Sequence, residues 1–361
     1  MFMLEKERFI AFLERPSDLK EMQAGQEVFA RQEVHYFIRS IQDVDEALRE
    51  LAPLLTNVDG FHAGALALLC GSLVERGGDV ALPIEVALEL TLRQLQQALS
   101  YRKVCRDLSA EELFLHFPEA TRAHYALNFT LLAAMTMLSR DKQKRKEWQQ
   151  RQDIRELVND VWLLCEEQRE RYDPLVYIKE LLNLLDDKEL LVLDPLDKRG
   201  FLVRLEGVQD RMYHCYALLQ YTLLEHVGPG YLNAKPVDPE AVRYAQNRDL
   251  APEDHQRAEE LSDEQRLAFY YPGALQQDEE GYELNAFAFF PGSASFYEIP
   301  RFDGMPVILI GEKTTTFTWR PNNMYPVLHD ALKSRIRIMR ELPLEEVETM
   351  LQRIVEHNTH S

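Results

Sequence analysis

Apolar residues recur every three to four positions through the first half of the chain, which is the spacing of one face of an α-helix. In residues 43–55 the apolar side chains that share such a face are Val44, Leu48, Leu51 and Leu55. Pro53 lies inside the same segment and is expected to break or kink its last turn. Similar segments follow one another, so we predict a mainly helical domain over residues 1–189.

Three of these helical segments carry further signals. Residues 61–78 end in a double glycine, and their small side chains would let another helix approach closely. These small residues are Ala63, Gly64, Ala67 and Gly71. Ser109 and Glu112 have the spacing of a capping box at the start of a short helix. Residues 119–138 are the most apolar helical segment, and we expect them at the centre of the N-terminal core.

The pattern changes near residue 190 to short runs that are typical of β-strands. The runs ELLVLD and GFLVRLE are joined by a connection that contains Pro195 and leads into Gly200, which predicts a β-hairpin. Phe201, Val203 and Leu205 would share one face of its second strand. A helix follows, so residues 190–232 are predicted to form a β-hairpin plus a helix.

An acidic stretch separates this hairpin from the C-terminal part. Residues 233–283 hold 13 acidic and 5 basic side chains, a net charge of −8, together with four prolines. We predict that residues 233–281 form an acidic connecting segment at the surface, with short helices at DPEAVRYAQ and at SDEQRLAFYY.

Residues 282–361 mix strand-like runs with a final helix. The strand-like runs are YELNAFAFF, SFYEIP, MPVILIG, TTTFTW and RIRIMREL, and the final helix is PLEEVETMLQRIVEH. We therefore predict a mixed α/β C-terminal part with a small antiparallel sheet. The fold class of the whole chain is predicted to be α+β.

The whole chain is acidic, with 41 basic and 60 acidic side chains and a net charge of −19 over 361 residues. Such a field repels phosphate backbones, which argues against general nucleic-acid binding. It suits a basic protein partner, although an acidic surface can also serve solubility alone. A basic run at residues 140–151 is interpreted as a solvated turn between helices.

The cysteine and hydropathy patterns favour a protein of the reducing cytoplasm. The four cysteines are spaced too widely for a disulfide framework or a zinc site. The first residues are acidic where a signal peptide needs a basic head, and the longest apolar run, LLAAMTML, is too short to span a bilayer. We expect a cytoplasmic protein, away from the membrane, with no metal and no other cofactor. The oligomeric state stays open.

Asp210 and His214 are the candidate catalytic residues. They are four positions apart, so on a helix they would face the same side, where the carboxylate could orient the imidazole as a general base. Cys215 is adjacent but would point about 100° away. The preferred interpretation is that Asp210 caps the helix and that His214 packs or is solvated. The buried stripe of this helix is expected to contain Met212, Tyr216, Leu219 and Leu223.

Two features of the C-terminal part remain. The motif IGEKTTT at residues 310–316 lacks the G-x-x-x-x-G-K-[ST] spacing of a phosphate loop, so we expect a hairpin turn there. Aromatic side chains are dense between residues 287 and 325, and a surplus beyond one sheet face would line a groove or an interface. These are Phe287, Phe289, Phe290, Phe296, Tyr297, Phe302, Phe317, Trp319 and Tyr325.

Two groups of segments also carry a resemblance. LLVLDPLDKRGFLVRLEGVQD followed by LLQYTLL, and EIPRFDGMPVILIG with ELPLEEVETML, resemble an uncharacterised group of bacterial cytoplasmic proteins. The resemblance implies that the hairpin, the helix and the C-terminal strands belong to one evolutionary unit. It implies no activity and no site residues.

Two functions follow as hypotheses. The first is a non-catalytic interaction protein, such as an immunity or adaptor protein, that covers a basic protein partner. Its contact is expected at Glu259, Glu260, Asp263 and Glu264. The second is an enzyme or small-molecule-binding protein with its site near the C-terminal aromatics and Asp210/His214.

Overall fold

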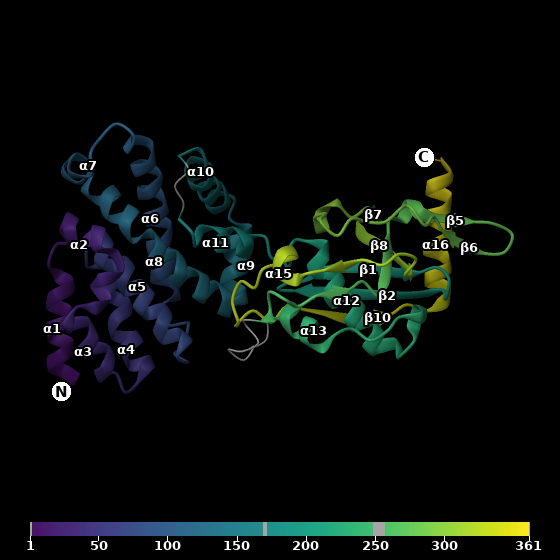
Figure 1. The fold of residues 1–361 in the computed structure, drawn as a ribbon, viewed down its shortest axis with the longest axis horizontal. Helices are drawn as coiled ribbons and strands as arrows, with labels where there is room; N and C mark the ends of the chain where they lie inside the picture. The colour runs from purple at the N-terminus through teal and green to yellow at the C-terminus, as the bar shows by residue number, and fades with distance from the viewer. Residues whose placement is uncertain (1, 169–171, 248–256, 361) are drawn as a thin grey trace. The chain divides into compact units, whose positions relative to one another are not determined.

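The computed structural model describes residues 2–168, 172–247 and 257–360. The chain forms two compact units, Met1–Leu182 and Asn183–Ser361. The first unit is helical, and the second combines helices with a mixed β-sheet (Figure 1). The predicted α+β class is confirmed. Within the described residues, no helix is long and apolar enough to cross a membrane.

The first unit is a succession of helices, as the apolar spacing predicts. Its α-helices are α1 (Phe2–Glu14), α2 (Leu19–Ala24), α3 (Gln32–Ser40), α4 (Val44–Leu51), α5 (Gly60–Glu75), α6 (Ile84–Val104), α7 (Ala110–His116), α8 (Pro118–Arg140), α9 (Lys142–Gln150), α10 (Gln152–Gln168) and α11 (Leu175–Leu182). Two 3₁₀ helices, η1 (Gly25–Ala30) and η2 (Ala52–Thr56), lie between them. α4 ends before Pro53, and Ser109 and Glu112 form the predicted capping box.

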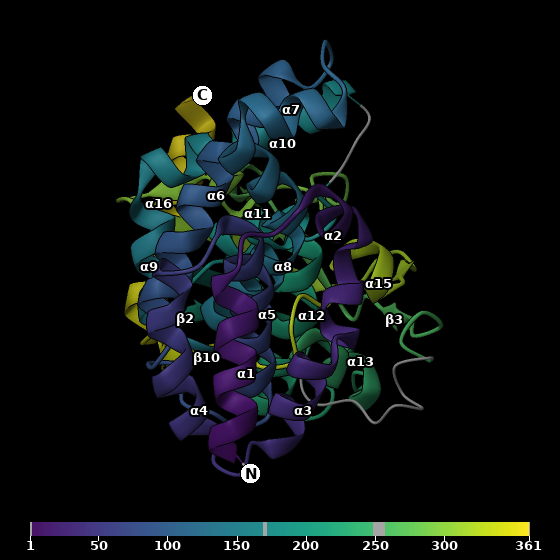
Figure 2. The same ribbon diagram turned by 90° about the vertical axis from the view of Figure 1, so that its left-hand side faces the viewer.

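The packing of α5 against α8 depends on small residues. A Cβ atom on Gly64 would lie 2.6 Å from the Cβ of Ala126, and one on Gly71 would lie 3.2 Å from the Cα of Ala133. The two helices therefore run in close contact, and both views show them side by side within this unit (Figures 1 and 2). The prediction of a close helix approach at these small residues is confirmed.

A six-stranded sheet organises the second unit. Its strands are β1 (Lys188–Asp194), β2 (Arg199–Glu206), β4 (Leu267–Tyr270), β7 (Arg301–Phe302), β8 (Met305–Glu312) and β10 (Arg335–Glu341). The order is β10-β2-β1-β8-β4, and β7 also pairs with β8. β1 and β2 form the predicted antiparallel hairpin, while β1 and β8 run parallel. Two small antiparallel ribbons pair β3 (Asp263–Glu264) with β9 (Thr318–Trp319) and β5 (Leu275–Gln277) with β6 (Tyr282–Leu284).

Helices cover both faces of this sheet. The helical segments are α12 (Met212–Val227), α13 (Pro239–Ala245), α15 (Pro321–Met324), α16 (Leu344–His360), η3 (Tyr231–Asn233), η4 (Pro272–Ala274) and η5 (Phe296–Glu298). Side chains along β1 point alternately to the two faces of the sheet. Leu190 and Val192 pack into the core on the α12 side, whereas Leu191 and Leu193 pack on the α16 side. The predicted stripe of α12, including Tyr216 and Leu219, is buried.

Some predicted elements are wrong. Residues 262–271, predicted as a capped helix, contain β3 and β4, because all four residues of β4 are buried and pair with β8. The run SFYEIP contains η5 instead of a strand. The hairpin turn expected at IGEKTTT is absent from the described chain, since β9 pairs with β3 and not with β8. Part of the predicted connecting segment, residues 248–256, lies outside the described residues.

Candidate functional site

Asp210 lies just before α12 and does not cap it. The N-cap residue is Arg211, which makes no side-chain capping bond. The Asp210 carboxylate accepts hydrogen bonds from the Ser295 hydroxyl at 2.7 and 2.9 Å and from the Phe296 backbone nitrogen at 2.8 Å. The predicted cap is therefore wrong, because a loop far along the chain supplies donors that the local sequence does not reveal. Asp210 ties the start of α12 to that loop.

His214 is buried inside the second unit. Its Nδ1 accepts a hydrogen bond from the Gln209 backbone nitrogen at 3.0 Å, and its Nε2 donates to the Ala245 carbonyl at 2.7 Å. Burial lowers the pKa of His214 to about 4, so the ring is neutral near pH 7. Both nitrogens are thus engaged, so the bond through which Asp210 would orient His214 is not formed within the described chain, and His214 packs as the preferred interpretation expects. The adjacent Cys215 thiol is buried too, and burial raises its pKa to about 12, which makes it unreactive as a thiolate.

An aromatic pocket lies beside α12, on the face of the sheet that this helix covers. Its volume is about 200 Å³, and seven of its twelve lining residues are aromatic. These seven are Tyr213, Tyr216, Phe269, Phe289, Phe290, Phe317 and Trp319. They come from α12, β4, the loop that follows β6, and the segment around β9, so the pocket exists only in the folded unit.

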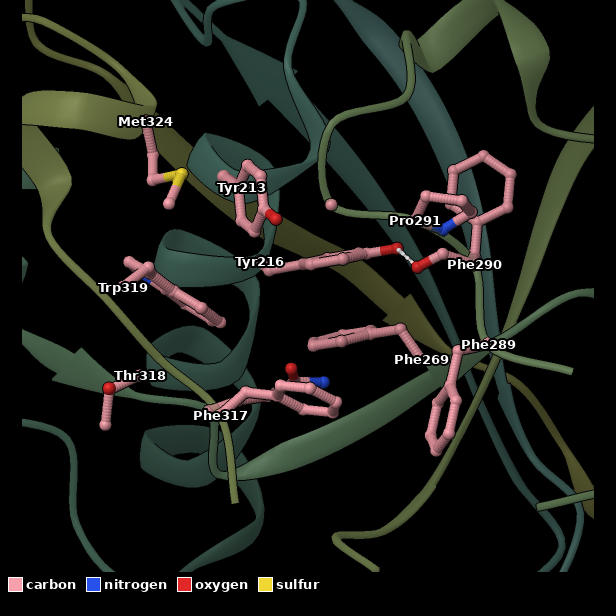
Figure 3. Close-up of a pocket in the computed structure, with 12 residues that line it drawn as sticks. Tyr213, Tyr216, Phe269, Phe289, Phe290, Pro291, Phe317, Thr318, Trp319 and Met324 are labelled. Atoms are coloured by element: carbon pink, nitrogen blue, oxygen red, sulfur yellow. Dashed lines mark hydrogen bonds between the residues drawn. The ribbon is translucent and has the colours of Figure 1, made fainter. Parts of the chain in front are cut away.

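The walls of the pocket are fixed by ring packing. Tyr216 and Phe269 stack with their ring centres 3.8 Å apart and their planes within 3°. Figure 3 shows this stacked pair in the middle of the pocket, with Trp319 on one side and Phe289 on the other. Tyr216 also donates its hydroxyl hydrogen to the Phe290 carbonyl at 3.0 Å, which is the dashed line in Figure 3. These contacts hold the rings in place before any ligand arrives.

One glycine shapes the rim. A Cβ atom on Gly292 would lie 2.4 Å from the ring of Tyr213, so a larger residue would fit there only if the ring or the loop moved. The Tyr213 backbone nitrogen donates to the Gly292 carbonyl at 2.7 Å, so helix and loop meet directly. Glycine at this position therefore lets the loop lie against the Tyr213 ring and complete the pocket wall.

The pocket supports binding better than catalysis. Among the described residues that line it, none is charged and none is a cysteine or histidine. Within the described chain, no group of three His, Cys, Asp or Glu side chains is arranged to hold a metal ion. Aromatic rings with a few polar atoms are typical of recognition sites that take an apolar or flat group.

A buried polar cluster adjoins the pocket wall at Trp319. Asp263 is the cross-strand partner of Trp319 in the β3–β9 ribbon, and the charge of Asp263 raises the pKa of Tyr325 further above what burial produces. Asp263 Oδ1 is buried and has no hydrogen-bond partner in the described part of the chain, while the side chains of Trp319 and Tyr325 lie close enough to interact with each other. Burial raises the pKa of Asp263 to about 6. This cluster places an incompletely satisfied acid next to an aromatic wall.

The four predicted interaction residues divide into two pairs. Glu259 and Glu260 are exposed, as a contact surface requires. Asp263 is buried, with 2% of its surface exposed, and its Oδ2 accepts a hydrogen bond from the Gln220 side chain. Glu264 is half-buried and forms an ion pair with Lys313. Only the first pair lies where it could meet a partner without disturbing the fold.

The sequence signal that best matches the pocket is the density of aromatic residues. Of the nine that were singled out, Phe289, Phe290, Phe317 and Trp319 line the pocket, while His214 and Asp210 do not. Tyr213 and Phe269 were not expected there, because only the folded sheet brings α12 and β4 to the same place.

Comparison with known proteins adds no further guide. No protein-family model, no curated protein and no solved structure matches this chain.

Proposed function

We propose that this chain is a non-catalytic interaction protein that binds a basic protein partner. The second unit makes the contact, and one side chain of the partner enters the aromatic pocket as an anchor. The immunity and adaptor classes fit this kind of activity, since both act by covering another protein. The observation that carries the proposal is the set of seven aromatic rings around a small pocket without a charged lining residue in the described chain.

Interface energetics support an anchor of this kind. The strongest contributions to protein–protein binding come from a few side chains that insert into well-packed, desolvated pockets. A pocket of about 200 Å³ lies below the roughly 300–1,000 Å³ that is common for small-molecule sites, so a single side chain suits it better. Phe317 lines the pocket and is half exposed, which gives an apolar edge at which a partner surface can pack.

Charge supports a basic partner. The net charge of −19 would attract a basic protein and speed its encounter. Glu259 and Glu260 are exposed and belong to the same compact unit as the pocket. We place this activity in the cytoplasm, which agrees with four cysteines that form no disulfide.

A small neutral ligand is the second candidate. The partly enclosed aromatic pocket favours it, because such a lining also binds flat apolar molecules. The two candidates differ in salt dependence: a neutral ligand should bind equally at low and high ionic strength, whereas a basic protein should not.

A capture experiment tests the proposal. The whole chain is immobilised and exposed to a lysate of the cells that produce it, and bound proteins are identified by mass spectrometry. Phe317→Ala should lose a basic partner, whereas Phe287→Ala should keep it, because Phe287 is 93% exposed and lies outside the pocket lining. Capture should also weaken as salt rises from about 0.05 to 0.5 M. A partner that binds wild type and Phe317→Ala equally contradicts the proposal.

A further inference from the structure

We propose that the side chain that enters the aromatic pocket is an arginine of the partner. This inference rests on the proposed function and adds the chemical identity of the anchor. It is carried by the hydrogen-bonding state of the polar groups in the lining, by the shape of the pocket and by the charge around it.

Two polar groups of the lining, the Tyr216 hydroxyl and the Gln265 amide, have each committed a donor within the chain. The hydroxyl hydrogen of Tyr216 is committed to the Phe290 carbonyl, so the phenolic oxygen can still accept but not donate into the pocket. The Gln265 side chain donates through Nε2 to the Leu267 carbonyl at 2.8 Å. That bond fixes the orientation of the amide, because a carbonyl can only accept, and it leaves Gln265 Oε1 without a donor in the described chain. A ligand rich in N–H groups complements this arrangement.

The rings restrict the shape of the donor. Flat groups stack against aromatic faces, and the guanidinium of arginine is planar, weakly hydrated and able to stack in this way. A lysine ammonium is a compact, strongly hydrated charge, so it loses more on entering a pocket of aromatic carbon. Among basic side chains, arginine therefore fits both the acceptors and the rings.

A negative charge lies next to the pocket wall. Asp263 faces Trp319 across the β3–β9 ribbon, and its Oδ1 has no hydrogen-bond partner in the described chain. A guanidinium in the pocket would be attracted by this carboxylate, although Arg266 offsets part of the field, since it is close enough to Asp263 to counter part of the rise in pKa that burial causes. The chain as a whole, at −19, adds to the attraction at longer range.

Two nearly isosteric probes test the inference directly. N-acetyl-arginine methylamide and N-acetyl-citrulline methylamide share a shape, but in citrulline a carbonyl oxygen replaces one nitrogen and removes the charge. Calorimetric titration of the whole chain should give about tenfold tighter binding of the arginine probe, the difference expected for charged donors on neutral acceptors. The fluorescence of Trp319 provides a second readout, and Trp319→Phe removes it.

Variants assign the effect to the acceptors. Tyr216→Phe keeps the stacked ring and removes the accepting oxygen, so binding of the arginine probe should weaken about tenfold. Tyr297→Phe is the matched control, because Tyr297 is exposed and outside the lining, and should leave binding unchanged. If Tyr216→Phe lowers the melting temperature, Gln265→Met replaces it as the acceptor-removing variant.

The outcomes separate this inference from the proposed function. Equal binding of both probes, or arginine binding that survives loss of either acceptor, overturns the arginine assignment and leaves the pocket as a binding site. If neither probe binds while Phe317→Ala still abolishes partner capture, the anchor is another side chain. That result contradicts the arginine inference and leaves the proposed function intact. If the Phe317→Ala variant still captures the partner, the proposed function itself is contradicted.

Discussion

The two units build their interiors in opposite ways. In the first, α5 and α8 meet through Gly64, Gly71 and alanines, so backbones approach where side chains are smallest. In the second, large rings such as Tyr216 and Phe269 fill the space between α12 and the sheet. Small residues leave little room between helices, whereas rigid rings have few ways to pack and leave a gap at their edge. The pocket therefore lies among the aromatic rings of the second unit.

Both interiors also contain buried polar groups. In the first unit, Gln94 bridges helices, donating to the Gly60 carbonyl at 2.7 Å and accepting from the Thr130 hydroxyl at 2.5 Å. In the second unit, Asp263 keeps a buried oxygen without a partner in the described chain. The first unit also keeps such an atom, Ser139 Oγ, so what distinguishes the second unit is that its unpartnered oxygen lies beside a pocket.

The largest expected effect concerns the tight helix contact. Gly64→Val should destabilise the first unit by about 3 kcal/mol, because the added atoms meet Ala126 where even a Cβ would be too close. Ser72→Val, at an exposed position of the same helix, should change stability by less than about 0.5 kcal/mol. Denaturant unfolding in a Trp319→Phe background reports this unit through Trp148 and Trp162. Equal midpoints for the two variants would show that the contact between α5 and α8 tolerates a larger side chain at residue 64.

His214 should make the second unit sensitive to acid. Its pKa falls from 6.5 to about 4 on folding, so the folded state binds fewer protons than the unfolded state between these values. The stabilisation is complete above pH 6.5 and is lost as pH falls through about 4, a change on the order of 3 kcal/mol. His214→Gln should remove this slope, measured by hydrogen exchange of the α12 amides. A variant with an unchanged acid slope would contradict the buried neutral histidine.

Asp263 should produce the opposite slope. Burial raises its pKa from 3.8 to about 6, so the folded state binds more protons and its stability falls as pH rises through this window. Asp263→Asn should therefore stabilise the second unit at pH 7 by about 2 kcal/mol and flatten the pH profile between 4 and 6. Glu260→Gln is the nearby control, since Glu260 is exposed. A destabilised Asp263→Asn at pH 7 would show that the carboxylate is satisfied in solution.

A smaller loss is expected at Asp210. Asp210→Ala removes acceptors for the Ser295 hydroxyl and the Phe296 backbone nitrogen, which should cost about 1–2 kcal/mol. The helix α12 itself should keep its start, because Asp210 is not its cap. Thermal unfolding gives the loss, and exchange of the α12 amides locates it. Faster exchange at the start of α12, with the 292–296 loop unaffected, would restore the capping interpretation.

The smallest effect on stability is expected at the acidic surface. Reversal of Glu259 and Glu260 to lysine should change the free energy of unfolding by less than about 0.5 kcal/mol, because both side chains are exposed. With the basic partner in hand, the same reversal should slow association, and the slowing should shrink as salt rises. Stopped-flow association rates measure this. Rates that respond to neither charge nor salt would assign the acidity to solubility alone.

The elements that the sequence predicts well are those with local signals. The helical face of residues 43–55, the capping box at Ser109 and the β1–β2 hairpin depend on neighbours a few residues away. The helix predicted at residues 262–271 is wrong because the sequence there begins like a helix cap. The strand partners of these residues, on β8, lie about forty residues later in the chain. The sequence predicts only part of the pocket lining for the same reason. The density of aromatic residues indicates Phe317 and Trp319, whereas Tyr213 joins them only through the tertiary structure.

The strand order of the central sheet has a consequence for the order of folding. The β1–β2 hairpin closes within a few residues, but its neighbours in the sheet are synthesised much later: β8 begins at Met305 and β10 at Arg335, whereas the hairpin ends at Glu206. The helices of the first unit can pack as soon as they emerge, whereas the hairpin waits with both edges open. Open strand edges pair readily with other chains. Nascent chains that end before β10 should therefore be the species most prone to aggregate and the ones that most need a chaperone.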